Sequence, residues 1–443
     1  MDNFVPSPQK AIKDFLKRIE KKKVKIAVVG LGYVGLPLAV EFASKGLEVL
    51  GLEIDKDRLE HIKRGESYIT DVGEDELRAV LRSGKFNASG DFRSLRHIDV
   101  IIICVPTPLK RKYHPNISYI KQAVKAISKN LKKGSLVILE STTYPGTTEE
   151  VILPLLEIKG LRHNRDFFLS FSPERIDPGN VNYPVNKIPK IVGGITNEAT
   201  ALSVAVYENI IEKVVRVSSA KTAETAKLLE NTFRLVNIGL IDELAIMAHK
   251  MNIDIWEVID AASTKPFGFM PFYPGPGVGG HCIPKDPLYL YWKAKHSGFS
   301  SRFIKLASDI ISDMPEYVVS RIELILKKSN KKLKDSKILV IGVTYKKDIK
   351  DLRKSPGIDI ISSLHKRNIP VSYFDPLIPY LRLNSINLKS IELTKDVLGN
   401  FDCAVIAADH SRLDYDFILR NSKLIFDTRN VYKIKKDRKV FVL

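Results

Sequence analysis

A loop rich in glycine and proline, residues 274–286 (PGPGVGGHCIPKD), holds a side chain that could do covalent chemistry. Glycine and proline at this density exclude a regular helix or strand, and glycines let a ligand approach the backbone closely. Cys282 ends the glycine run and could act as a nucleophile through its thiolate. Asp286 follows four residues later and could reach the same site. The alternative is a buried, inert cysteine in a rigid turn.

Three further polar side chains could serve this chemistry. His281 could act as a base, although a single histidine beside a cysteine is more often a hydrogen-bonded structural residue. Lys227 and Asn231 are four positions apart, so they share one face of a helix. On local grounds these two could equally belong to a solvated face.

A second glycine-rich segment, GLGYVG at residues 30–35, matches the dinucleotide-binding fingerprint G-x-G-x-x-G. It follows a β-rich run and opens a helix, as such a site requires. Gly30 would make the tight turn, Gly32 would admit the pyrophosphate, and Gly35 would let helix and strand pack closely. The phosphates would then lie at the helix N-terminus, where free N–H groups favour negative charge.

Glu53 lies 23 positions after Gly30, at the end of the next predicted strand. A carboxylate there can hold the ribose 2′-hydroxyl and repels a 2′-phosphate, so NAD is favoured over NADP. Asp55 is an alternative for the same role. A purely structural glycine turn with surface acids is the remaining interpretation.

Hydrophobic patterning indicates which elements position these residues. Strands are expected at 24–29 and 48–53, with a helix at 36–45 between them that ends before Gly46. This order is a βαβ unit, which implies a parallel sheet. A doubly wound domain is therefore expected over about residues 20–215. Its further strands are expected at 100–105, 136–141, 167–171 and 190–192.

Residues 221–251 predict a long helix that acts as a spine and a dimerisation surface. Its apolar stripe consists of Leu229, Phe233, Val236, Leu240, Leu244 and Met247. More helix is expected at 255–263 and 289–328. A lysine-rich linker, 329–337, leads to a last α/β region whose strands are expected at 338–343, 371–374, 403–407 and 424–426, with a helix at 358–365.

The predicted fold class is therefore α/β, with two Rossmann-like doubly wound domains joined by a long central helix and a helical dimerisation region. We divide the chain into an N-terminal helical extension (1–23), an NAD-binding Rossmann domain (24–215), a central helical domain with the cysteine loop (216–328) and a C-terminal α/β domain (329–443).

Composition excludes several classes of protein. The 443 residues are 44% hydrophobic and 27% charged, which is globular, and no apolar run approaches the ~20 residues of a membrane span. The net charge of +19 would attract anions, but the lysines are dispersed and lack interleaved aromatics, so we expect no nucleic-acid or membrane partner. Three scattered cysteines and no secretory signal indicate no metal site, no disulfide framework and a cytoplasmic protein.

Seven ordered motifs together resemble one family, the UDP-sugar 6-dehydrogenases that act on UDP-glucose and UDP-N-acetylhexosamines. The resemblance covers residues 24–432. The motifs are GLGYVG (30–35), CVPTP (104–108), ESTTYPGTT (140–148), FSPERIDPGN (171–180), AKLLENTFR (226–234), FYPGPGVGGHCIPKDP (272–287) and GVTYKKDIKDLRKSP (342–356).

The resemblance implies a two-step, four-electron oxidation of a primary alcohol to a carboxylate with two NAD⁺. Cys282 would attack the C6 aldehyde, and the thiohemiacetal would lose a hydride to give a thioester that water hydrolyses. Lys227 would stabilise the oxyanion, with Asn231 donating beside it. Asp286 would serve in base chemistry with a water. Thr142 and Glu174 match the remaining catalytic positions.

The resemblance also implies the binding residues, whereas the long helix at 221–251 predicts a homodimer or higher homo-oligomer. Those expected to bind the cofactor are Gly30, Gly32, Tyr33, Val34, Gly35, Glu53, Arg58, Pro106, Thr107, Ser141, Thr142 and Arg353. Those expected to bind the substrate are Glu174, Arg175, Lys227, Asn231, Phe272, Tyr273, Gly275, Gly277, Gly279, Lys346 and Arg429.

Two sequence features bear on the catalytic acids and on the identity of the sugar. Some members carry a second acid four positions after the Glu174 equivalent, where this chain has Pro178 with Asp177 beside it. The run 267–284 is similar to the N-acetylhexosamine branch, so UDP-N-acetylglucosamine is the first choice of substrate. UDP-N-acetylmannosamine, UDP-N-acetylgalactosamine and UDP-glucose follow. A non-catalytic NAD-binding sensor and a nucleic-acid-binding protein are the alternatives from other classes.

Overall fold

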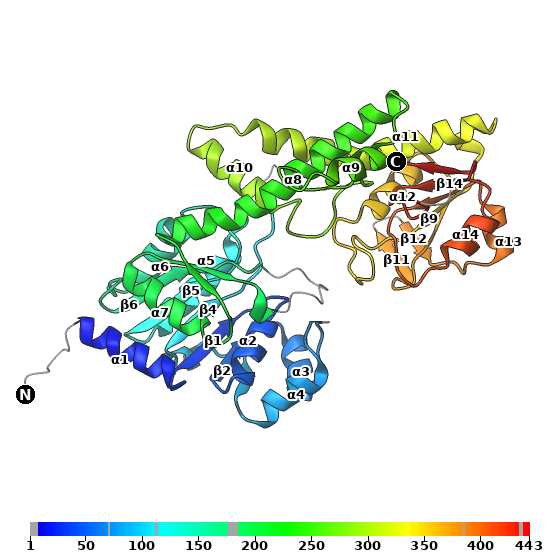
Figure 1. The fold of residues 1–443 in the computed structure, drawn as a ribbon. Coiled ribbons are helices and arrows are strands. Elements are labelled where there is room, and N and C mark those ends of the chain that lie inside the picture. Colours follow the sequence, from blue (N-terminus) through cyan, green and yellow to red (C-terminus); the bar gives the residue numbers. More distant parts are fainter. Residues whose placement is uncertain (1–7, 70, 111–113, 176–184, 384–385, 434–436) are drawn as a thin grey trace, which may run out of the picture. The chain divides into compact units, whose positions relative to one another are not determined.

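The computed structural model describes residues 8–69, 71–110, 114–175, 185–383, 386–433 and 437–443 (Figure 1). These form two compact units. The first comprises the chain up to Glu230 together with Trp292–Gly298, and the second comprises Asn231–Tyr291 and Phe299–Leu443.

The first unit is built on an eight-stranded sheet. Its strand order is β3-β2-β1-β4-β5-β6-β7-β8, so the chain winds outward in both directions from the boundary between β1 and β4. That boundary is the switch point at which such sheets bind ligands. The strands are β1 (Lys25–Val29), β2 (Glu48–Leu52), β3 (Phe86–Ser89), β4 (Val100–Ile103), β5 (Ser135–Leu139), β6 (Phe167–Phe171), β7 (Lys190–Gly194) and β8 (Val214–Arg216).

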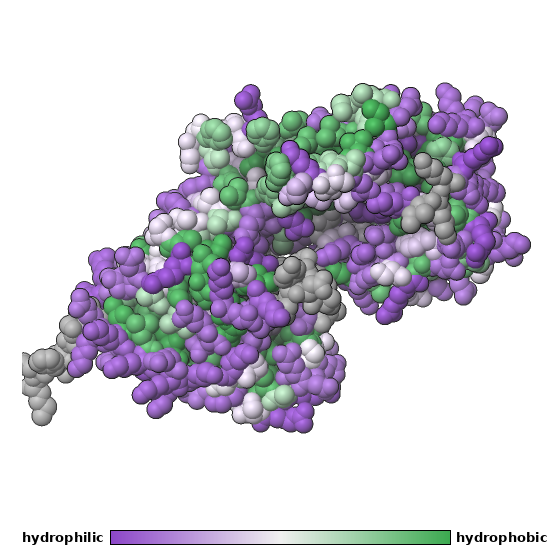
Figure 2. Space-filling view, in the orientation of Figure 1, coloured by the Kyte–Doolittle hydropathy of each residue, from purple (hydrophilic) through white to green (hydrophobic). Residues whose placement is uncertain are grey.

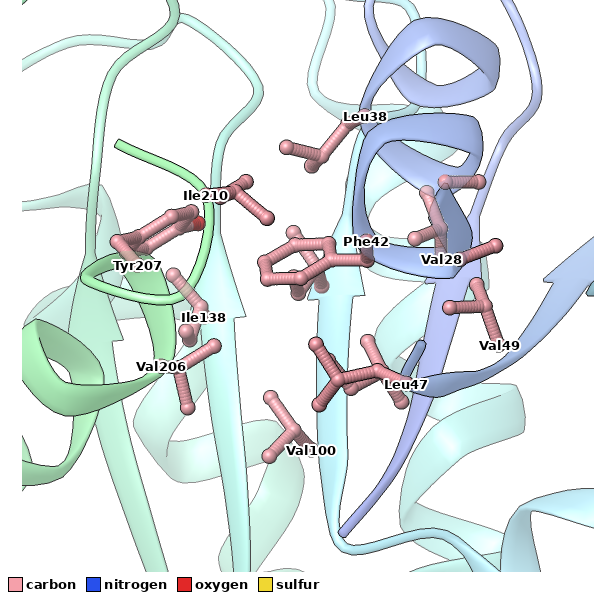
Figure 3. Packing of buried hydrophobic residues seen from close by; sticks show 14 of the residues in the cluster. Val28, Leu38, Phe42, Leu47, Val49, Val100, Ile138, Val206, Tyr207 and Ile210 are labelled. Carbon is pink, nitrogen blue, oxygen red and sulfur yellow. The ribbon is translucent and has the colours of Figure 1, made fainter. Parts of the chain in front are cut away.

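Helices cover both faces of this sheet, which confirms the doubly wound prediction. On one face Phe42 of α2 (Gly35–Ser44) packs against Tyr207 at the end of α7 (Asn197–Tyr207), with ring centroids 6.1 Å apart (Figure 3). On the other face Val124 of α5 (Ser118–Asn130) belongs to a second apolar cluster. The other described helices of this unit before α8 are α1 (Pro8–Glu20), α3 (Lys56–Arg64), α4 (Glu74–Arg82) and α6 (Leu153–Glu157). There are also 3₁₀ segments at Phe92–His97 and Val185–Lys187 and a π-helical segment at Thr148–Ile152.

The sheet departs from the expected parallel arrangement at its last two strands, since β8 is parallel to β7. β7 runs antiparallel to β6, pairing Ser170 with Gly194 and Phe171 with Gly193. A parallel pair requires a crossover of a dozen or more residues, usually a helix. In the described part of the β6–β7 connection the chain forms only the short turn Val185–Lys187. The expected parallel arrangement therefore does not hold for the β6–β7 pair.

The second unit contains a five-stranded parallel sheet in the order β10-β9-β13-β14-β15, beside a two-stranded hairpin. Its strands are β9 (Ile338–Ile341), β10 (Val371–Phe374), β13 (Cys403–Ile406), β14 (Ile425–Asp427) and β15 (Val440–Val442), and the hairpin is β11 (Tyr380–Leu383) with β12 (Ile386–Lys389). Its helices include α12 (Pro356–Lys366), α13 (Lys395–Asn400) and α14 (Tyr415–Asn421), and a short turn forms at Leu333–Asp335. The prediction of two Rossmann-like α/β regions is confirmed.

The long helix α8 (Ala220–Lys250) begins and ends one residue before its predicted bounds, and α9 (Ile255–Ser263) matches its prediction. The helix expected over 289–328 is instead two helices, α10 (Asp286–His296) and α11 (Arg302–Lys328). Gly298 separates them with a φ of +82°, a conformation that ends helices. Within the described residues, no helix is both long and apolar enough to cross a membrane.

Part of the predicted apolar stripe of α8 is exposed in the single chain. Figure 2 shows apolar groups interspersed with polar ones over α8. The large exposed side chains of the stripe are Leu229, Phe233, Leu240 and Met247.

Candidate active site

The glycine turn joins the end of β1 to the start of α2. Gly30 has a φ of +91°, and a Cβ atom there would lie 2.9 Å from the carbonyl oxygen of Cys104. A Cβ on Gly35 would lie 1.9 Å from the carbonyl oxygen of Gly30, which no side chain can tolerate. Around Gly32 the space is open, with the Arg58 guanidinium 4.0 Å from such an atom as the nearest contact. The turn therefore has the cradle that a pyrophosphate needs.

Glu53 is tied directly to this turn. Its carboxylate is buried and accepts the N–H of Leu31 at 3.0 Å, while Arg58 lies 3.3 Å away. Asp55 is exposed and instead caps α3, accepting the N–H groups of Asp57 and Arg58. Of the two acids, Glu53 is thus the one placed beside the dinucleotide cradle. Tyr33 is exposed on the same turn, and Val34 precedes the first residue of α2.

The loops after β4 and β5 leave the same edge of the sheet, because the two strands are parallel neighbours. The Ser141 hydroxyl donates to the carbonyl of Val105 at 2.7 Å and so ties the two loops together. Thr107 is buried beside the exposed Pro106, and Thr142 is half-buried. Four of the expected cofactor residues are therefore gathered at the carboxyl ends of two strands.

A buried glutamate that the sequence analysis missed shapes the loop after β5. Glu224 of α8 accepts hydrogen bonds from the Gly146 N–H (2.5 Å) and from the Thr148 N–H (2.9 Å) and hydroxyl (2.7 Å). Burial raises the pKa of Glu224 to about 7, against the effect of these donors.

Glu174 and Arg175 follow β6. The Lys190 ammonium lies 3.0 Å from the Glu174 carboxylate, and Arg175 forms a 2.7 Å ion pair with Glu230. Lys190 also contacts Glu140, another residue that the sequence analysis did not single out. Asp177 and Pro178, which bear on the second acid, lie outside the described residues.

Lys227 and Asn231 lie one turn apart on α8, and both are buried. They do not belong to a solvated face. The side-chain amide of Asn231 donates to a carboxylate oxygen of Asp286 at 2.7 Å. The second oxygen of Asp286 lies 3.6 Å from the Lys285 ammonium. Asp286 is 1% exposed, so its charge is held in the interior by these contacts.

Cys282 is exposed, whereas Cys104 and Cys403 are buried. Its carbonyl accepts the N–H groups of Lys285 and Asp286, which forms the turn at the start of α10. The structure therefore does not place Cys282 in a buried, inert position. Partial desolvation of the ring, with the charges of Lys285 and Arg353, lowers the pKa of His281 to about 4. His281 is neutral at physiological pH and is a weak base.

The glycines before Cys282 make close contacts that side chains would prevent. A Cβ on Gly279 would lie 2.5 Å from Cβ of Tyr345, and one on Gly275 would lie 2.9 Å from the Arg429 guanidinium. Gly277 has a φ of +124°. The Gly275 N–H donates to Asp242 at 3.0 Å, a buried carboxylate whose pKa burial raises to about 7.

The aromatic pair that precedes these glycines contacts other parts of the second unit. The Phe272 ring lies 5.8 Å from that of Phe233. Tyr273 stacks on Trp256 at 5.5 Å, and its hydroxyl donates to Asp260.

Lys346 and Arg353 lie on one segment, residues 342–356, which we call the strap. Two buried residues anchor it. Asp375 accepts the N–H of Val343 at 2.7 Å, and the ring of His410 accepts the N–H of Asp348 at 3.0 Å. Arg353 is paired with Asp351 on the strap itself, and its carbonyl accepts the Gly280 N–H at 2.8 Å. The strap is thus bonded to the cysteine loop.

Sequence comparison places this architecture among known proteins. Three domains of the UDP-glucose/GDP-mannose dehydrogenase family match in order: the NAD binding domain at 24–211, the central domain at 221–311 and the UDP binding domain at 339–434. The chain belongs to this family. It is therefore an NAD-dependent nucleotide-sugar dehydrogenase, and its glycine turn fits the dinucleotide.

Individual relatives are similar over most of their length. A UDP-N-acetyl-D-glucosamine 6-dehydrogenase of Pseudomonas aeruginosa is 42% identical over 80% of this chain and 83% of its own. A UDP-N-acetyl-D-mannosamine dehydrogenase of Pyrococcus horikoshii is 35% identical over 93% of this chain and 96% of its own. The solved structure of the UDP-D-ManNAc dehydrogenase from Pyrococcus horikoshii superposes with a TM-score of 0.84 at 33% identity, covering 94% of this chain and 98% of that one.

Proposed function

We propose that this dehydrogenase oxidises the C6 alcohol of a UDP-N-acetylhexosamine to the carboxylate, giving a UDP-aminouronate for a surface polysaccharide or glycan. UDP-N-acetylglucosamine is the first choice of substrate. The observation that carries the proposal is the arrangement of an exposed Cys282 four residues before a buried Asp286 that Asn231 holds. Such a set is suited to covalent catalysis.

The cysteine is needed because the second oxidation starts from an aldehyde, whose carbonyl carbon cannot release a hydride until a nucleophile adds. When bound, NAD⁺ accepts one hydride in each of the two oxidation steps. The Cys282 thiolate adds to the C6 aldehyde to form a thiohemiacetal, and oxidation of that adduct leaves a thioester on the sulfur. Water then attacks the thioester, which releases the carboxylate and restores the thiol.

The neighbouring side chains have complementary roles. Lys227 and Asn231 donate to the oxyanion that develops on the substrate, an interaction that is strong in a site shielded from water. The Asp286 carboxylate oxygen that Asn231 does not contact lies 3.6 Å from the Lys285 ammonium and has no hydrogen-bond donor among the described residues, so it can accept a proton from the attacking water. Thr142 and Glu174 complete the proposed catalytic set.

We assign the cofactor and the substrate to two sets of residues. NAD is held by Gly30, Gly32, Tyr33, Val34, Gly35, Glu53, Arg58, Pro106, Thr107, Ser141, Thr142 and Arg353. The UDP-sugar is held by Glu174, Arg175, Lys227, Asn231, Phe272, Tyr273, Gly275, Gly277, Gly279, Lys346 and Arg429. The proposed functional domains are 24–215 for NAD, 216–328 for dimerisation and the cysteine loop, and 329–443 for the UDP-sugar, after the extension 1–23.

The similarity to two kinds of relatives supports an N-acetylhexosamine substrate. The Pseudomonas protein named for the glucosamine sugar is the more identical of the two, at 42% against 35%. This favours UDP-N-acetylglucosamine over UDP-N-acetylmannosamine. UDP-N-acetylgalactosamine and UDP-glucose remain the further alternatives.

We also propose that the enzyme is a homodimer that uses the exposed apolar stripe of α8. Exposed side chains of this size on one helix face favour burial against a second copy. Phe233→Glu would place a charge in that interface. Light scattering should then report the monomeric mass for the variant and twice that mass for the unaltered enzyme.

A panel of UDP-sugars, followed by NADH absorbance, tests the activity and the sugar together. The proposal predicts two NADH per UDP-sugar oxidised, and a Cys282→Ser variant that does not complete turnover. Cys403→Ala, at a buried cysteine outside the site, is the matched control and should retain activity. One NADH per sugar with the intact enzyme would contradict the mechanism. Normal NAD binding with no turnover on any UDP-sugar would favour the NAD-binding sensor.

A further inference from the structure

A lysine lies buried between two glutamates in the first unit. Lys190, the first residue of β7, is 4% exposed. Its ammonium lies 2.7 Å from the carboxylate of Glu140 and 3.0 Å from that of Glu174. The Tyr207 hydroxyl donates to the same Glu140 oxygen at 2.5 Å. These four side chains form one hydrogen-bonded cluster.

The cluster keeps a positive charge in the protein interior. The two carboxylates raise the pKa of Lys190 above its ordinary value, against the desolvation that would lower it. The other titratable groups that face it are Tyr207 and the Cys104 thiol, and burial raises the pKa of each. Both are therefore neutral at physiological pH. A buried ammonium is stable only with such partners, so its position is fixed by the carboxylates it contacts.

The cluster lies under the proposed cofactor edge of the sheet. The Cys104 thiol is 3.7 Å from the Glu140 carboxylate, and the Cβ of Cys104 would be 3.2 Å from a Cβ on Gly35. Glu174 follows β6, the strand next to β5. The Glu174 oxygen that Lys190 does not contact accepts the N–H of Arg175 at 2.6 Å. One carboxylate oxygen of Glu174 is thus held by the main chain and the other by Lys190.

We propose that Lys190 is a positioning residue for Glu174, and that Glu140 and Tyr207 hold the Lys190 ammonium in place. This inference rests on the proposed function, in which Glu174 is catalytic. Lys190 keeps Glu174 ionised and oriented, so that Glu174 accepts hydrogen bonds or a proton at the reacting end of the sugar. The position four residues beyond Glu174 is Pro178 and carries no acid. Lys190 of β7 therefore supplies the charged support of Glu174, and Glu140 acts by holding Lys190.

The first test compares Lys190→Met with Lys190→Arg. Loss of the ammonium should lower kcat about tenfold, because a general base that loses its position loses part of its contribution. The acid limb of the kcat–pH profile should move up by about one unit, since an adjacent positive charge favours a carboxylate. Lys190→Arg keeps the positive charge, so its kcat and its acid limb should stay close to those of the unaltered enzyme. Lys132→Met, which removes another lysine from a buried carboxylate (Asp99, 2.6 Å away), is the control and should change neither.

A double-mutant cycle separates a positioning role from a general loss of stability. If Lys190 acts through Glu174, then Lys190→Met should have little further effect on kcat in a Glu174→Gln background. Equal effects in both backgrounds would overturn the proposal. If Lys190→Met does not fold, Glu140→Gln provides a milder change that keeps an acceptor for Tyr207. It should lower kcat less than Lys190→Met does, because Lys190 loses one of its two carboxylate partners, and the acid limb of the kcat–pH profile should move slightly down, since a negative charge near Glu174 is removed.

An infrared titration tests the cluster without turnover. The carboxylate band of Glu174 is identified by its absence in Glu174→Gln, and its midpoint should be higher in Lys190→Met than in the unaltered enzyme. An unchanged midpoint would contradict the role of Lys190, whatever the enzyme oxidises. Absence of NADH formation with every UDP-sugar, together with a shifted midpoint, would instead contradict the proposed function alone.

Discussion

The side-chain amide of Asn231 on α8 donates a 2.7 Å hydrogen bond to the carboxylate of Asp286, the first residue of α10. Both side chains are buried. This bond ties the long helix to the end of the cysteine loop, 55 positions further along the chain. The position of the proposed base therefore depends on a residue of another helix.

Asn231→Ala should lower kcat and destabilise the fold. The substitution leaves the buried Asp286 carboxylate without this donor, which costs about 1–3 kcal/mol. The control is Asn237→Ala, which removes the same side chain six residues further along α8, where it bonds only its own helix among the described contacts. Steady-state kinetics and thermal unfolding measure both effects. Equal kcat values for the two variants would contradict a role of Asn231 in the site.

Gly35→Ala should abolish NAD binding or weaken it at least tenfold. The added Cβ would lie 1.9 Å from the Gly30 carbonyl oxygen, so the glycine turn must shift. Calorimetric titration with NAD⁺ measures the loss. Gly73→Ala, where nothing lies within 4 Å of the new atom, should bind NAD normally. Tight binding by Gly35→Ala would show that the turn is more adaptable than its packing indicates.

Asp242→Asn should make stability less dependent on pH. Burial raises the pKa of Asp242 in the folded protein to about 7 from an ordinary value of 3.8. A raised folded pKa means that the folded state binds the proton more tightly, so stability falls as the pH rises from about 4 through 7. The full effect is up to ~4 kcal/mol. Asparagine cannot ionise and still accepts the Gly275 N–H.

Melting temperatures between about pH 5 and pH 8 therefore should fall more steeply for the unaltered enzyme than for Asp242→Asn. Some slope should remain, because Glu224 has a raised pKa for the same reason, and adding Glu224→Gln should reduce it further. Parallel melting curves for the enzyme and Asp242→Asn would show that Asp242 is ionised in both states over this range.

His410→Ala should raise the KM for the UDP-sugar. The ring accepts the N–H of Asp348 and contacts Asp375 at 3.2 Å, and so anchors the strap that carries Lys346. Initial rates at varied UDP-sugar concentration measure the change. His365→Ala, on the exposed face of α12 in the same unit, should leave the KM unaltered. A variant in which kcat alone falls would indicate that the strap serves chemistry rather than binding.

Local patterns predicted much of the fold. β6, β10 and α9 have the predicted bounds, and α8 differs by one residue, because apolar periodicity records how each segment is buried. The strands β3, β8 and β15 and the hairpin β11–β12 were missed. These strands have three or four residues each, and few of their side chains are buried, so they leave little pattern.

The glycine turn and Cys282 could be found from sequence, because their residue types are unusual and contiguous. The buried residues that hold the cysteine loop, the loop after β5 and the strap in place could not be found in this way. Asp242 bonds a residue 33 positions away, Glu224 one 78 positions away, and His410 one 62 positions away. When a buried acid or histidine lies in a helix or near the end of a strand, the residues around it in sequence do not indicate which distant residue it contacts. The antiparallel β7 was missed for the same reason, since strand direction depends on a long connection.

The burial of Cys104 and Cys403 leaves Cys282 as the accessible thiol among the three cysteines of the chain. The natural sequence is therefore already suited to site-selective labelling. A soft electrophile should add a single mass increment per folded chain, and UDP-sugar should slow that reaction. Covalent probes or inhibitors aimed at this enzyme could accordingly be screened by intact-protein mass spectrometry, without first engineering away competing sites.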